Sequence, residues 1–244
     1  AGCVPYRGYF DREEALRFAQ KQRARGFDVS VSGAAAYSTL GWFRDPLLDT
    51  MLSSQEEQLA AVIFHELAHE DLYVRGDTAF NEAWAGFMEK IGVQRWLTSQ
   101  GDMARLRQWN RRKEAARQFN ALLLEYRRHL NGVYSSKQPE AVMRQQKQNI
   151  IERLASDYDD LVAQDWQGQN YFSGWLGAEV NNAHLALVSS YEGGFCAFAS
   201  LYRQAGENLA EFRVLAKARA ARKKQERSAW LHQDCEAVAS TDDL

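Results

Sequence analysis

The residues of this chain with the clearest potential for chemistry are His65, Glu66 and His69, which form an H-E-x-x-H pattern. They lie in an apolar run, Leu59 to Leu72, whose composition predicts a helix. Side chains four residues apart share one helix face, so the two imidazoles can bind one metal ion. Zn²⁺ accepts nitrogen ligands at about 2.0–2.1 Å and lowers the pKa of a bound water to about 7. We therefore interpret Glu66 as the general base of a zinc-dependent hydrolase.

The residues around this pattern favour a metal site over an accidental pair of histidines. The chain has five histidines, and two of them flank a glutamate in a segment that is otherwise apolar. Buried polar groups are costly without a partner, and a metal ion is a suitable partner. The alternative is a pair of ordinary surface histidines or hydrogen-bonded core histidines.

A catalytic zinc site commonly has three protein ligands, and two glutamates on the next predicted helix, at about 79–96, could supply the third. If the two helices pack antiparallel, Glu82 lies level with the histidines. Glu89 lies two turns further along the same face and is the alternative ligand. The stretch that begins at Asn81 resembles the N-E-x-x-A pattern of the gluzincin peptidases, and this resemblance favours Glu82.

Longer stretches resemble a bacterial family of zinc aminopeptidases that are often predicted to be lipoproteins. They are GCVPYRGYF (2–10), AYSTLGWF (36–43), FHELAH (64–69) and LYVRGDTAFNE (72–82), and the similarity extends to about Arg213. The resemblance implies a peptidase with Zn²⁺ as cofactor, located in the bacterial cell envelope, with membrane contact only through a lipid anchor absent from this chain. Two features depart from the family: its members usually carry a segment before the first stretch, and Gly193-Gly194 is unusual.

The composition is that of an ordinary globular protein. Of the 244 residues, 45% are hydrophobic and 25% are charged, and the net charge is −2. A chain of this length can bury a sizeable core, and it has no net positive field to attract nucleic acid. No run of roughly 18 apolar residues predicts a membrane span. We expect Cys196 to be a buried small residue, while Cys3 and Cys235 could form a disulfide.

Two basic segments are interpreted as solvated helix faces. For the arginines from Arg105 to Arg117 the alternative is a nucleic-acid surface, and for Lys217 to Arg227 it is contact with acidic lipid headgroups. The aromatic loop at 167–177 either lines a substrate cleft or packs on the surface.

The predicted fold is α+β and predominantly α-helical: one zincin-like domain over 1–230, followed by a polar tail at 231–244. Alternation at Phe27–Val31 predicts a strand of a small sheet, and residues 33–37 could pair with it. Residues 36–40 either bind the substrate backbone as an edge strand or form an ordinary strand. Hydrophobic periodicity predicts a long helical hairpin at about 102–166. Its first helix should break at 132–138.

Local signals predict several other helix boundaries. Asp11 is the expected N-cap of a first helix, and Ser54 with Glu57 forms an expected capping box. Asp77 or Thr78 should cap the helix that carries Glu82. A single helix is expected over 209–226.

The predicted mechanism places Zn²⁺ on His65, His69 and Glu82. Glu66 activates the water and passes its proton to the leaving amine. Tyr191 is the candidate donor to the oxyanion, with His184 as second choice. An aminopeptidase would also need a carboxylate for the substrate ammonium, and the candidates are Glu192, Glu179 and Asp71. The alternatives are an endopeptidase of the same class, or a non-catalytic envelope scaffold with a structural zinc.

Overall fold

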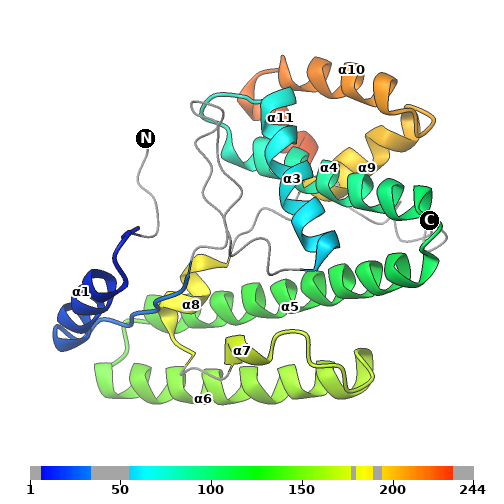
Figure 1. Cartoon of the computed structure of the whole chain (residues 1–244). Coiled ribbons are helices and arrows are strands. Elements are labelled where there is room, and N and C mark those ends of the chain that lie inside the picture. Colours follow the sequence, from blue (N-terminus) through cyan, green and yellow to red (C-terminus); the bar gives the residue numbers. More distant parts are fainter. Residues whose placement is uncertain (1–6, 34–54, 177–179, 189–193, 233–244) are drawn as a thin grey trace. The chain divides into compact units, whose positions relative to one another are not determined.

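The computed structural model describes residues 7–33, 55–176, 180–188 and 194–232. Within these ranges every regular element is a helix and no strand occurs (Figure 1). No described helix is long and apolar enough to cross a membrane. The helices are α1 (Arg12–Ala24), α3 (Glu56–Asp71), α4 (Thr78–Ser99), α5 (Met103–Ser135), α6 (Glu140–Asp160), the π-helix η1 (Leu161–Asp165), α7 (Ser173–Leu176), α8 (Asn182–Leu187), α9 (Phe195–Gln204), α10 (Leu209–Ala220) and α11 (Lys224–Leu231).

The expectation of an α+β fold with a small sheet is wrong, because the described chain is all-α. The segment Phe27–Val31 has no regular secondary structure. Its polar groups make contacts other than strand pairing. The Asp28 carboxylate binds the Lys147 ammonium at 2.5 Å, and the Asn181 side-chain amide donates to the Val29 carbonyl at 3.4 Å. Five alternating residues cannot form a sheet without a partner strand. Apart from Gly33, the segments at 33–37 and 36–40 lie outside the described residues.

The chain divides into two compact units, each made of two separate stretches. Unit 1 comprises residues 1–33 and 110–190, and unit 2 comprises residues 34–109 and 191–244. Helix α5 begins in unit 2 and continues into unit 1 after Trp109. The single domain expected over 1–230 stays a prediction.

Unit 1 is built on the hairpin of α5 and α6, which occupies the region where the sequence predicted it (Figure 1). The break expected at 132–138 comes later, since α5 continues to Ser135. Phe119 of α5 stacks on Phe172 with ring centroids 4.8 Å apart and contacts Tyr158 of α6 at 5.2 Å. The aromatic loop therefore packs on the hairpin, as one of the two interpretations proposed.

Unit 2 is held together by aromatic rings from four helices. Trp84 and Phe80 of α4 are fully buried, as are Phe198 of α9 and Phe212 of α10. Trp230 of α11 covers the same cluster, 4.9 Å from the ring of Phe198. Full burial of such a side chain is worth about 1.5–3 kcal/mol, so this core fixes α4 firmly.

Helix α3 packs chiefly against α4, and Gly92 lies at a close contact between them. A Cβ atom at Gly92 would lie 2.7 Å from Cγ of Phe64 on α3. The missing side chain thus lets the Phe64 ring lie directly on the backbone of α4. Gly86, one and a half turns earlier on α4, would meet nothing within 4 Å.

The turn between α3 and α4 is fixed by a buried ion pair with α11. Asp77 is the N-cap of α4, where its Oδ1 accepts from the amide of Phe80 at 3.4 Å. Its Oδ2 accepts from Nε of Arg227 at 2.7 Å, and both side chains are buried. Lys224, also on α11, donates to the carbonyl of Gly76 at 2.9 Å.

Three sequence interpretations need correction at helix ends. The single helix expected over 209–226 is two helices, α10 and α11, and Arg227 is buried and not solvated. Gln55 is the N-cap of α3, and Glu57 is buried against Arg105 at 2.5 Å. Ser54 lies outside the described residues. The expected N-cap Asp11 is confirmed, accepting from the amide of Glu14 at 2.8 Å.

Two glycine substitutions on α4 should have opposite effects on stability. Gly86→Ala should raise the free energy of unfolding by about 0.5–1 kcal/mol, because alanine is the better helix former. Gly92→Ala should lower it by about 1 kcal/mol, because forcing Phe64 aside costs more than the helix gains. Urea titrations of both variants would measure this, and an equal gain in both would contradict the close approach.

Removing one charge of the buried ion pair should be strongly destabilising. Asp77→Asn keeps a good N-cap but leaves the Arg227 guanidinium buried without its carboxylate, which should cost about 3–5 kcal/mol. Asp102→Asn is the matched control, because Asp102 caps the amide of Arg105 while its side chain is 38% exposed. Urea unfolding should show a much smaller loss there; losses of similar size would refute the special role of the pair.

Candidate metal centre

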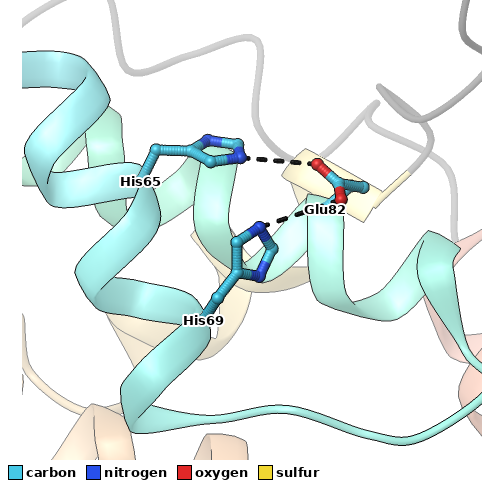
Figure 2. Close-up of side chains that lie close together, drawn as sticks. All are labelled: His65, His69 and Glu82. Carbon is cyan, nitrogen blue, oxygen red and sulfur yellow. Dashed lines mark ion pairs between the residues drawn. The ribbon is translucent and has the colours of Figure 1, made fainter. Parts of the chain in front are cut away.

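Helices α3 and α4 bring together His65, His69 and Glu82. The turn that joins the two helices lies between His69 and Glu82 in the sequence. The two histidines stand one turn apart on α3, and Glu82 lies near the start of α4. Figure 2 shows both imidazole rings directed at the carboxylate. The antiparallel helix pair thus places Glu82 level with the histidines.

The spacing of the polar atoms fits a divalent metal ion. Nε2 of His65 lies 3.4 Å from Oε2 of Glu82, and Nε2 of His69 lies 3.8 Å from Oε1 (Figure 2). One ligand atom from each residue can be chosen so that all lie within 4.8 Å of one another. Ligands about 2 Å from a tetrahedral metal stand roughly 3.3 Å apart, which is close to the separation between His65 and Glu82. Two imidazoles and a carboxylate form a donor set suited to zinc.

Three hydrogen bonds hold the start of α4 against α3 and the turn that follows it. The amide of Asn81, 2% exposed, pairs with the backbone of Val74 twice, accepting from its N–H at 2.8 Å and donating to its carbonyl at 2.9 Å. Nε1 of Trp84 donates to the carbonyl of Ala68 at 2.9 Å. Asn81 and Trp84 stand on either side of Glu82 in the sequence, so these bonds fix its backbone from two sides. The sequence drew attention to Asn81 only through the Asn-Glu motif.

Glu89, the alternative third ligand, lies on the far side of His65. Its Oε2 is 3.2 Å from Nδ1 of His65, and its side chain is 16% exposed. The His65 ring therefore has a carboxylate at each nitrogen, Glu82 at Nε2 and Glu89 at Nδ1. The two glutamates do not compete for one place, because each faces a different atom of the ring.

The charges of this cluster are strongly coupled. Burial lowers the pKa of His65, but hydrogen bonds to Glu82 and Glu89 outweigh burial and raise it to about 9. Burial lowers the pKa of His69 below its usual value. The hydrogen bond from His65 holds the pKa of Glu82 below its usual range. The carboxylates thus attract positive charge to the place where a metal ion would lie.

Glu66 and Tyr73 border the cluster. Glu66 is half-buried on α3, and its charge favours the protonated form of His69. Tyr73 is 50% exposed, and its ring meets that of His69 edge-on with centroids 6.4 Å apart. Sequence analysis did not single out Tyr73, although its position four residues after His69 was a usable signal.

The other predicted site residues fall into two groups. Tyr191, Glu192 and Glu179 lie outside the described residues. His184 belongs to unit 1, where its Nδ1 accepts from the amide of Asn181 at 3.3 Å in the capping box of α8.

Asp71 is already engaged by two cations. Its carboxylate accepts from Nε of Arg213 at 2.8 Å and lies 3.3 Å from Nζ of Lys217. The hydrogen bond from Arg213 is the main reason why the pKa of Asp71 is lowered. This pairing speaks against Asp71 as the anchor for a substrate ammonium.

Cys196 differs from its expected role as a buried small residue. It is half-buried on α9 and disulfide-bonded. Cys3 and Cys235, the remaining cysteines, lie outside the described residues.

Comparison with known proteins identifies a family for this chain. No curated protein and no solved structure matches it. A family model described as "Putative aminopeptidase" matches residues 1–231, which is nearly the whole chain and includes α3 and α4. The chain belongs to this aminopeptidase family.

Proposed function

We propose that this protein is a zinc-dependent aminopeptidase in which His65, His69 and Glu82 hold the metal ion. The observation that carries the proposal is the convergence of two imidazoles and one carboxylate from α3 and α4. The family description supports peptide substrates in general. The proposed zinc ion and mechanism go further than that family description.

The chemistry assigns one role to each side chain. A bound zinc ion would supply Lewis acidity toward the scissile carbonyl and the attacking water. Glu66 takes a proton from that water as the new C–O bond forms, and it returns a proton to the amine as the C–N bond breaks. Tyr191 stays the proposed donor to the developing oxyanion. His184 is no longer favoured, because its imidazole already caps α8.

A structural zinc in a scaffold protein is the competing function. Structural zinc sites are closed by four protein ligands, commonly cysteines. Among the described residues the cluster offers three ligands, and no cysteine belongs to it. The half-burial of Glu66 next to His69 also supports catalysis, because a scaffold would have no use for a base there.

We propose the bacterial envelope as the location, with peptides as the binding partners. The disulfide at Cys196 supports this proposal, because disulfides persist in oxidising compartments. Arg105 and Arg117 form ion pairs with glutamates, which supports the absence of a nucleic-acid surface.

Changing the base should separate metal binding from catalysis. Glu66→Gln should bind zinc with the stoichiometry of the wild type but hydrolyse peptides about 10²–10⁴-fold more slowly, because the amide cannot accept the proton. Glu70→Gln, an exposed position on the same helix, should behave like the wild type. Metal analysis and a fluorogenic peptide assay would measure both properties. Equal cleavage by Glu66→Gln and the wild type would remove Glu66 from the mechanism.

The aminopeptidase proposal predicts the pattern of products. Mass spectrometry of a peptide library should show single residues released from the amino end, and blocking the amino group by acetylation should prevent cleavage. Internal cuts that persist in acetylated peptides would instead establish an endopeptidase with the same metal centre.

A further inference from the structure

We propose that Glu89 is a positioning residue that orients His65 for the metal ion. This inference rests on the proposed zinc site and goes beyond its ligands. Nδ1 of His65 contacts Oε2 of Glu89 at 3.2 Å, while Nε2 of the same ring faces Glu82. A histidine held in this way has one nitrogen committed to a hydrogen bond and the other directed at the metal position.

The spacing along α4 explains how one ring can meet both carboxylates. Glu82 and Glu89 are seven residues apart, which places them on nearly the same helix face about 10.5 Å apart along the axis. The two glutamates stand two turns apart on α4, and their carboxylates contact the two nitrogens of the His65 ring of α3. A ligand and its support therefore come from one rigid helix.

The contact should fix both the tautomer and the rotation of the ring. A carboxylate accepts but cannot donate, so it requires the proton of a neutral imidazole to be on Nδ1. The lone pair of Nε2 is then directed toward Glu82, where a metal ligand is needed. Because the Glu89 side chain is only 16% exposed, water competes weakly for this hydrogen bond. The negative charge also makes Nε2 a stronger ligand.

His69 provides an internal contrast. Its Nδ1 is buried and has no hydrogen-bond partner among the described residues. Among the described residues, the imidazole of His65 has a carboxylate at its Nδ1, and the imidazole of His69 does not. The orientation of the His65 ring is therefore supported by a hydrogen bond that the described residues do not provide for the His69 ring. Removal of Glu89 should change the orientation of the His65 ring and leave that of His69 nearly unchanged.

Zinc affinity of the full chain tests the proposal, measured by competition with a fluorescent chelator. Glu89→Ala should bind zinc about 10–100-fold more weakly than the wild type. Glu89→Gln should fall between them, because its amide oxygen accepts a hydrogen bond without the charge. Glu70→Ala is the matched control for removing an exposed carboxylate near the site, and it should keep the affinity of the wild type.

Imidazole NMR of ¹⁵N-histidine-labelled protein supplies a readout that a general loss of stability would not produce. In the zinc-loaded wild type the Nδ1 proton of His65 should resonate far downfield, as expected for a hydrogen bond to a carboxylate. The Glu89→Gln variant, which preserves side-chain volume, should shift this signal upfield while the His69 signals stay in place.

The outcomes separate this inference from the proposed function. If the wild type binds zinc and the Glu89 variants match it in affinity and in the His65 signal, the positioning role is wrong and the zinc site stands. If the wild type itself fails to bind zinc, the proposed function is wrong and this inference falls with it.

Discussion

The structure around the site depends on one constraint: polar groups buried between two apolar helices must satisfy one another. His65 and His69 point into the contact between α3 and α4, where their side chains are 25% and 7% exposed. The cost of burying them is offset by Glu82 and Glu89, and a metal ion would offset it further. An isolated helix with the same sequence would offer the histidines only solvent, so the cluster is a property of the helix pair.

The packing of the pair explains why the carboxylates meet the correct atoms. Gly92 lets a side chain of α3 lie close to the backbone of α4. Trp84 donates a hydrogen bond to a backbone carbonyl near the end of α3, and Asn81 hydrogen-bonds to the backbone of the turn between the helices. These contacts fix the helices along and around their axes. A shift of one residue along α4 would move Glu82 by about 100° around that helix and away from both rings.

Short-range patterns in the sequence predicted much of this arrangement. The shared faces of the two histidines and of Glu82 and Glu89 follow from helix geometry alone, and N-cap preference narrowed the start of α4 to Asp77 or Thr78. The sequence left the roles of the two glutamates open, because assigning them requires knowing which nitrogen of His65 each one meets. Likewise, Arg227 looked like part of a solvated basic run, since its buried partner Asp77 lies 150 residues earlier.

The missing sheet has a similar explanation. Alternation over Phe27–Val31 indicates two differently exposed faces, but it does not identify what covers them. In the structure, Asp28 and the Val29 carbonyl contact Lys147 and Asn181, while Phe27 and Val31 are exposed. Neither contact could be inferred from the local pattern. Local periodicity is informative about helices, which close their own hydrogen bonds, and less so about extended segments, which depend on distant partners.

The contact between Asp77 and Arg227 has a consequence for biosynthesis. During translation, Asp77 is added to the chain long before Arg227, which lies 150 residues later. During that interval the histidines and both glutamates have already been synthesised, but the carboxylate at the head of α4 lacks its cation. Stable closure of the α3–α4 turn therefore awaits the translation of α11. The arrangement of His65, His69 and Glu82 therefore gains one of its supports from a helix that is synthesised well after the three residues themselves.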